Sequence, residues 1–239
     1  MRFRSSAVGV GWLVLQPLVH ILLFTLVFYK FFQVRWPSGD GTASEYGLQV
    51  FIGLTLYAFL AEVINRGPGS VWSYPYLVTK VRFPLAMLPA VLVGAAGVQV
   101  VLSLVIAAVL AVVRAPHAQA LLLPFYLLPL GIYGMALAWF LGAAGVYLRD
   151  IGHLAPSVSS LLMFLSPIFY PASMVPKSMQ WLVSINPLAW TSEAARGLLM
   201  HGQLPVTQQW VMHLLASCIC LLAGYWFFRR TQPGFADVL

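Results

Sequence analysis

Residues 85–113 read LAMLPAVLVGAAGVQVVLSLVIAAVLAVV, without one charged side chain. An α-helix needs about 20 apolar residues to cross the hydrocarbon core of a bilayer, which is about 30 Å thick. This run exceeds that length and therefore predicts a membrane-spanning helix. Its hydrophobicity is continuous, whereas the strands of a membrane β-barrel alternate between apolar and polar residues.

The composition of the whole chain agrees with this prediction. Of 239 residues, 61% are hydrophobic and only 8% are charged, whereas a soluble domain carries about 25% charged residues. We therefore predict an all-α integral membrane protein.

Further apolar runs divide the chain into six predicted spans, within a single transmembrane domain that covers residues 1–239. The fourth span contains Pro124 and Pro129, which a membrane helix tolerates when its neighbours satisfy the freed carbonyl groups. Pro167 and Pro171 end the fifth span early. The predicted boundaries are about 9–32, 46–64, 85–113, 118–148, 154–170 and 210–228.

The basic residues predict the orientation. Six spans place both termini on one side of the membrane, and Lys and Arg accumulate in cytoplasmic loops. One side collects Arg2, Arg4, Arg66, Lys80, Arg82, Arg149, Arg229 and Arg230. The other side collects Lys30, Arg35, Arg114, Lys177 and Arg196. The larger group predicts that both termini are cytoplasmic.

The net charge of +7 does not indicate a nucleic-acid partner, because the basic residues are scattered singly between apolar runs. Nucleic-acid-binding proteins gather such residues on one face or groove. The positive-inside bias and attraction to anionic lipid headgroups explain the charge.

Motifs of catalysis are absent from the sequence. None of the three lysines follows a glycine, so no phosphate-binding G-x-x-x-x-G-K-[ST] loop exists. The five histidines do not form a metal-binding H-E-x-x-H pattern. Cys218 and Cys220 point to different faces of a helix, which argues against a shared disulfide. We expect no catalytic residue, metal or cofactor on this chain, although a fold could still assemble an intramembrane enzyme site from distant residues.

Two connecting segments are longer than simple turns require. Residues 65–84 read NRGPGSVWSYPYLVTKVRFP on the predicted cytoplasmic side. Within them we predict a short surface helix at 76–81, stopped by Pro84, with Lys80 and Arg82 facing water or a partner. The alternative is an interfacial segment held to anionic lipid by its basic and aromatic residues.

The outer segment, residues 171–205, contains two apolar pieces at 181–185 and 188–200 that are each too short to cross. We predict that they re-enter the membrane. Asn186 can cap a helix whose first turn holds Pro187, and Glu193 can pair with Arg196 three residues later. The alternative is an amphipathic helix lying flat on the outer surface.

The fourth span carries small residues at Gly134, Ala138 and Gly142. This spacing of four predicts a close-packed helix face, whose partner helix belongs to this chain or to a second copy. Several aromatic residues are interpreted as membrane-belt, packing or channel-lining residues. They are Tyr57, Tyr133, Trp139, Phe164, Phe169 and Tyr170.

Several short motifs occur in order along the chain: GWLVLQP at 11–17, KVRFP at 80–84, YLRDI at 147–151, SPIFYP at 166–171, the Val175–Pro176 pair, INPL at 185–188, Arg196 and FADVL at 235–239. Together they resemble the membrane subunits of ATP-binding-cassette exporters for O-antigen, capsular polysaccharide and teichoic acid. The resemblance covers nearly the whole chain.

The resemblance implies a permease of the bacterial inner membrane in which two copies of this chain face each other. It implies two copies of a separate nucleotide-binding ATPase subunit, which hold ATP and Mg²⁺, and a lipid-linked glycan as substrate. The same resemblance leaves a drug or small-lipid exporter as an alternative. Two alternatives do not share the exporter fold: an intramembrane glycan-modifying enzyme and a noncatalytic membrane scaffold.

The resemblance also implies roles for particular residues. The coupling helix lies within residues 70–80, and the expected contacts with the ATPase subunit are Tyr76, Leu77, Lys80, Arg82, Arg149 and Asp150. The expected outer gate comprises Pro167, Pro171, Pro176, Asn186, Pro187, Glu193 and Arg196, and the aromatic residues named above line a channel on which sugar rings stack. We hypothesise that Arg149 and Asp150 brace the turn between spans four and five against the coupling segment. The alternative is an interfacial charge pair contributing under about 1 kcal/mol.

Overall fold

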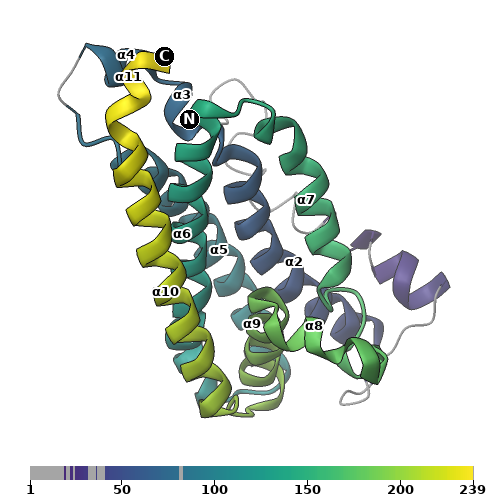
Figure 1. The fold of residues 1–239 in the computed structure, drawn as a ribbon. Helices are drawn as coiled ribbons and strands as arrows, with labels where there is room; N and C mark the ends of the chain where they lie inside the picture. The colour runs from purple at the N-terminus through teal and green to yellow at the C-terminus, as the bar shows by residue number, and fades with distance from the viewer. Residues whose placement is uncertain are drawn as a thin grey trace.

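The computed structural model describes residues 19, 22–23, 25–31, 36, 41–80 and 83–238. These residues form helices and short connections, with no strand among them (Figure 1). The predicted all-α class is therefore confirmed.

Within the described residues, four helical stretches are long and apolar enough to cross a membrane. They are α2 (Ala43–Arg66), α5 (Met87–Arg114), residues Ala118–Tyr147, which include α6 (Leu123–Tyr147), and residues Thr207–Val238, which begin with α10 (Thr207–Thr231). These stretches coincide with the second, third, fourth and sixth predicted spans.

The other two predicted spans differ from these. The fifth corresponds to α7 (Ile151–Leu165), an apolar helix of only 15 residues, because the chain leaves the helix just before Pro167. The first lies largely outside the described residues, which include the π-helix η2 (Thr25–Phe31). The motif at 11–17 also lies outside them.

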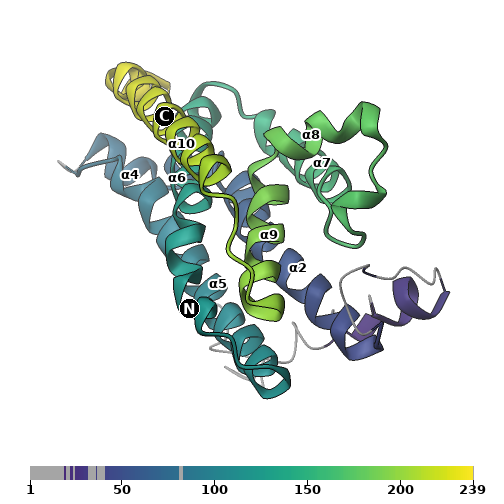
Figure 2. The same ribbon diagram turned by 90° about the horizontal axis from the view of Figure 1, so that it is seen from below.

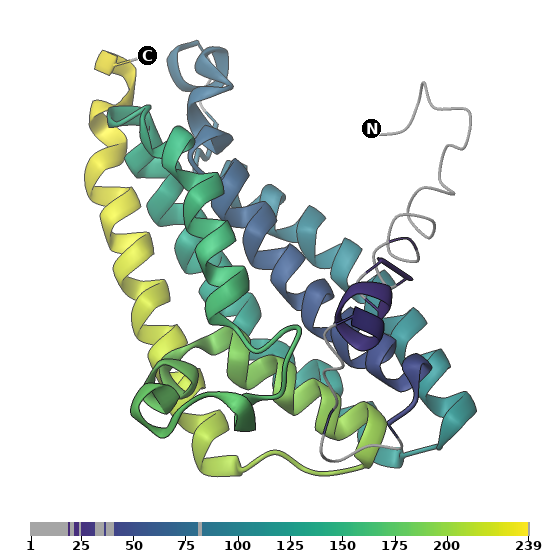
Figure 3. The same cartoon turned by 90° about the vertical axis from the view of Figure 1, so that its right-hand side faces the viewer.

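The long helices pack side by side, with α10 against α6, α6 against α5, and α2 between α5 and α7 (Figures 1 and 3). Helix α2 is the central element, because 72% of its most apolar window is buried, against 22–33% for the other three. The remaining helices expose apolar side chains such as Val98, Val105 and Leu222. Helices that face lipid tails have this character.

The connections gather at two opposite ends of the bundle. One end holds α3 (Gly69–Trp72), α4 (Pro75–Thr79), the turn between α6 and α7, and α11 (Phe235–Val238) (Figure 1). The other end holds α8 (Gln180–Ile185) and α9 (Pro187–Arg196), seen from below in Figure 2. The segments predicted to be cytoplasmic and outer therefore lie at different ends, and α4 is the short helix expected near 76–81.

The small residues of α6 form a packing face within the chain. A side-chain carbon at Gly134 would lie 2.5 Å from the Phe59 ring of α2, and one at Gly142 would lie 2.7 Å from Ser70 Oγ of α3. Ala138, between them, is fully buried. The partner of this face is therefore the same chain.

Close packing of α6 and α10 depends on Gly224, where a side-chain carbon would lie 2.6 Å from the Ala136 carbonyl oxygen. We expect Gly224→Ala to lower the free energy of unfolding by about 1–3 kcal/mol, because the two backbones must separate. The measurement is thermal unfolding of the purified protein in detergent. Gly131→Ala is the control: that position of α6 has no atom within 4 Å of the added carbon. An equal loss in both variants would contradict the role of Gly224.

Candidate functional site

The chain leaves helical geometry between α7 and the outer segment. Helix α7 ends at Leu165, and residues 166–170 form a bend that is almost wholly buried. We call residues 166–170 the break. Buried peptide groups outside a helix need other hydrogen-bond partners, since an unpaired one costs about 1–3 kcal/mol.

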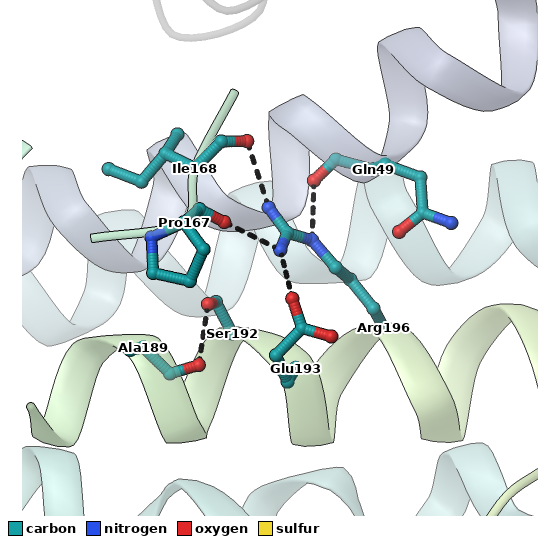
Figure 4. A network of polar contacts seen from close by, with 7 residues as sticks. All are labelled: Gln49, Pro167, Ile168, Ala189, Ser192, Glu193 and Arg196. Carbon is teal, nitrogen blue, oxygen red and sulfur yellow. Dashed lines mark hydrogen bonds and ion pairs between the residues drawn. The ribbon is translucent and has the colours of Figure 1, made fainter. Parts of the chain in front are cut away.

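Arg196, the last residue of α9, supplies two of these partners. Its Nη1 donates to the Pro167 carbonyl at 2.8 Å and its Nη2 to the Ile168 carbonyl at 3.0 Å (Figure 4). Its Nε donates to the Gln49 carbonyl of α2 at 3.0 Å. One guanidinium therefore joins the break, α2 and α9.

Two further side chains hold the break. The Tyr46 hydroxyl of α2 donates to the Phe169 carbonyl at 2.8 Å. Asn186 Nδ2 donates to Ser166 Oγ at 2.8 Å. Asn186 Oδ1 also accepts from the backbone N–H groups of Leu188 and Ala189, at 3.0 and 3.4 Å. The predicted cap of α9 is confirmed, and the same side chain ties that cap to the break.

The charge of Arg196 is compensated locally. Its side chain is 2% exposed, and Nη1 lies 2.8 Å from Glu193 Oε1, so the predicted pair is confirmed. The Trp36 ring centroid lies 4.8 Å from Cζ, in cation–π contact. Gly53 makes room for the guanidinium, since a side-chain carbon there would lie 2.6 Å from Nη2. A buried cation with this many partners is costly to disturb.

Most of the residues predicted for the outer gate meet in this network. Pro167, Asn186, Glu193 and Arg196 are joined by the bonds above, and Pro187 occupies the first turn of α9. Pro171 is buried directly after the break. Pro176 is exposed, between the short 3-10 helices η4 (Ala172–Met174) and η5 (Lys177–Met179), and is not part of the network.

The network also contains residues that sequence reasoning missed. Tyr46, Gln49 and Gly53 lie on one face of α2, at spacings of three and four. In the sequence, these three residues stand out as polar or small residues within an apolar span. That pattern does not identify their partners, which lie far along the chain.

At the opposite end, α3 and α4 rest on a small apolar cluster. Val71, Val146, Phe228 and Phe235 are buried there, and the Phe235 ring packs 5.5 Å from the ring of Phe228. None of the residues of α4 is buried. The α3–α4 segment therefore packs on this cluster and exposes three aromatic side chains: Trp72, Tyr74 and Tyr76.

The predicted coupling residues lie at this end. Tyr76 and Lys80 are exposed and Leu77 is half-buried, whereas Arg82 lies outside the described residues. Arg149 and Asp150 are exposed in the turn between α6 and α7. Within the described part of the chain, neither side chain forms an ion pair or contacts the coupling segment through a hydrogen bond.

The predicted channel aromatics are distributed over both ends. Phe169 and Tyr170 belong to the break, and Phe164 lies shortly before it. The Tyr170 hydroxyl donates to the Phe164 carbonyl at 2.9 Å, and Phe169 is buried. Trp139 Nε1 donates to the Ala86 carbonyl at 3.0 Å near the start of α5. Tyr57 and Tyr133 are half-buried in α2 and α6. Only Phe164, Phe169 and Tyr170 are brought together.

Residues 1–200 match the family model described as ABC-2 type transporter. The O-antigen export system permease protein RfbA of Myxococcus xanthus is 25% identical over 240 residues, which cover 99% of this chain and 90% of the relative. Two proteins of the same name from Klebsiella pneumoniae are each 22% identical over 242 residues, covering 100% of this chain and 90% of the relative.

We expect Arg196→Lys to lower the free energy of unfolding by about 2–5 kcal/mol, because an ammonium group cannot reproduce the fork that reaches three carbonyls and a carboxylate. The measurement is the thermal unfolding midpoint in detergent. Arg230→Lys is the matched control, since Arg230 is exposed at the end of α10. Equal midpoints for the two variants would show that the network does not stabilise the fold.

Proposed function

The chain belongs to the ABC-2 type transporter family, and from this premise we propose that it is the permease subunit of an ATP-driven exporter that carries a lipid-linked polysaccharide across the bacterial inner membrane. The proposed substrate class rests on the similarity, over 99–100% of this chain, to proteins named O-antigen export permeases. The exposed aromatic ring of Phe164 and the half-buried ring of Tyr170 at the break suit a substrate made of sugar rings.

We propose that a separate ATPase subunit, in two copies, drives a homodimer of this chain. ATP and Mg²⁺ belong to that subunit, consistent with the lack of a phosphate-binding loop in this sequence. The contact surface is the α3–α4 end. Exposed aromatic residues are typical anchors of protein interfaces, and Trp72, Tyr74 and Tyr76 have this exposure.

The packing of this end supports a coupling role. Helix α4 contacts α3 and α11, and both of these contact α6. Helix α3 also contacts α5. A displacement of α4 by the ATPase subunit would therefore reach the long helices through packed side chains. Arg149 and Asp150, exposed at the same end, are proposed as a second contact.

We propose that the break, α8 and α9 form the outer gate, with α8 and α9 re-entering the membrane from the outer side. Polar backbone at membrane depth is tolerated only where the protein satisfies it. The bonds from Arg196, Tyr46 and Asn186 have this effect. Opening the gate requires that these bonds be exchanged for others.

The proposed orientation places the α3–α4 end in the cytoplasm. We expect Ser73→Cys, in a background without Cys218 and Cys220, to react with a membrane-impermeant maleimide only after the cells are opened. Ser178→Cys should react in intact cells whose outer membrane has been permeabilised. Both serines are exposed, so they form a matched pair. Labelling of Ser73→Cys from outside would place the ATPase contact on the wrong side.

The function is tested by deleting the gene and measuring polysaccharide on the cell surface. We expect surface polymer to be lost, lipid-linked polymer to accumulate inside, and the wild-type gene to restore export. Unchanged surface polymer would overturn the proposed function.

In the same cells, we expect Tyr76→Ala to reduce export and co-purification of the ATPase subunit about tenfold or more, as for an interface anchor. Trp226→Ala is the control, because Trp226 is an exposed aromatic residue on the flank of α10. Full co-purification with Tyr76→Ala would contradict the proposed contact.

A further inference from the structure

A second polar site lies on the other side of Glu193, between the outer segment and α10. It is a cavity of about 380 Å³ whose walls come from residues 172–193 and the first two turns of α10. Small-molecule sites commonly have volumes of about 300–1,000 Å³ and combine apolar walls with a few convergent polar groups. The polar and aromatic residues of this lining are Ser173, Gln180, Ser184, Trp190, Glu193, Gln209 and His213.

The charge of the lining limits the ligand. Glu193 is the only residue among those that line the cavity with a formal charge, and no Lys or Arg is among them. Arg196 binds Oε1 of Glu193, yet the side chain remains 40% exposed. The carboxylate therefore keeps the capacity to accept hydrogen bonds from a ligand. No Lys or Arg lines the cavity to bind an anionic ligand such as a phosphate, and the Arg196 guanidinium is already occupied by Glu193 and three backbone carbonyls.

The inner wall is aromatic. The Trp190 and His213 rings are stacked, with centroids 5.1 Å apart and planes at 27°. Both residues are buried, and His213 Nε2 has no hydrogen-bond partner. The wall therefore offers a ligand aromatic surface and not a hydrogen bond, because Nε2 itself is enclosed.

The mouth supplies neutral polar groups. Gln180, Ser184 and Gln209 are exposed around it, and the amide of each glutamine can both donate and accept. Val183 and Met212 provide apolar surface beside them. The lining therefore combines hydrogen-bonding groups of both kinds with apolar and aromatic faces.

We propose that this cavity binds one neutral sugar unit, a polyhydroxylated ring whose hydroxyl groups meet Glu193, Gln180 and Gln209 and whose apolar C–H face meets the aromatic wall. The proposal rests on the proposed function and deepens it, because it assigns the exported glycan a binding site separate from the proposed channel-lining aromatic residues. A volume of about 380 Å³ is large enough for a single sugar ring. Glu193 belongs to both the cavity and the Arg196 network, so an occupying sugar shares a side chain with the proposed gate.

The test uses the purified full chain in detergent and saturation-transfer NMR with free probes. The probes are methyl glucoside and methyl N-acetylglucosaminide, which are neutral, methyl glucuronide, which is anionic, and O-phosphoethanolamine, a lipid-headgroup analogue. We expect the neutral glycosides to bind, and glucuronide to bind more weakly. Gln209→Leu should weaken binding of the neutral glycosides about 3- to 10-fold through loss of a hydrogen bond.

Gln208→Leu is the matched control, because Gln208 is exposed on the same helix turn but does not line the cavity, and its binding should equal that of the wild type. The proposal is overturned if no neutral glycoside binds, or if Gln209→Leu and Gln208→Leu bind alike. It is also overturned if O-phosphoethanolamine binds more tightly than the glycosides and depends on Gln209, which would indicate a headgroup site.

The failure of this proposal is distinct from the failure of the proposed function. If the gene is required for surface polysaccharide but the NMR test is negative, the exporter stands and the sugar site does not. If surface polysaccharide is independent of the gene, the proposed function fails, and the NMR result alone decides whether the cavity binds sugars.

Discussion

Buried carbonyl groups in the break impose the main constraint on this fold. Residues 166–170 leave helical geometry inside the protein, where water cannot hydrogen-bond their carbonyl groups. An arginine from α9 donates hydrogen bonds to two of these carbonyls instead. The position of α9, the glycine at position 53 and the carboxylate of Glu193 all follow from placing a guanidinium there. Because Arg196 is buried in this way, its main role in the fold is structural.

Local patterns in the sequence were sufficient for part of this structure. Continuous apolar runs predicted the positions of α2, α5, α6 and α10, and the Asn–Pro pair at 186–187 predicted the start of α9 with its cap. The Glu193–Arg196 pair followed from a helical spacing of three. Each of these features is set within a few residues.

Other features depend on contacts between distant segments. The bond from Arg196 to the Gln49 carbonyl joins residues 147 positions apart, and an apolar pattern in α2 carries no information about that partner. The cavity beside Glu193 likewise needs α10 to lie against the outer segment. The aromatic residues predicted to line a channel lie apart in space. Trp139 donates a hydrogen bond at the start of α5, whereas Phe169 is buried at the break. Helix α2 is the element that contacts the break near Gln49 and leads directly, after Arg66, into α3 at the other end.

The burial of Phe235 has a practical consequence for handling the protein. Helix α11 packs its phenylalanine against Phe228 and Tyr147 and lies against α4 (Figure 1). A fluorescent protein or affinity tag fused close after α11 would emerge beside the exposed aromatic residues of α3 and α4 and would obstruct a partner that binds them. Purification handles and reporters are better inserted elsewhere, with a long flexible spacer if the carboxyl end must be used.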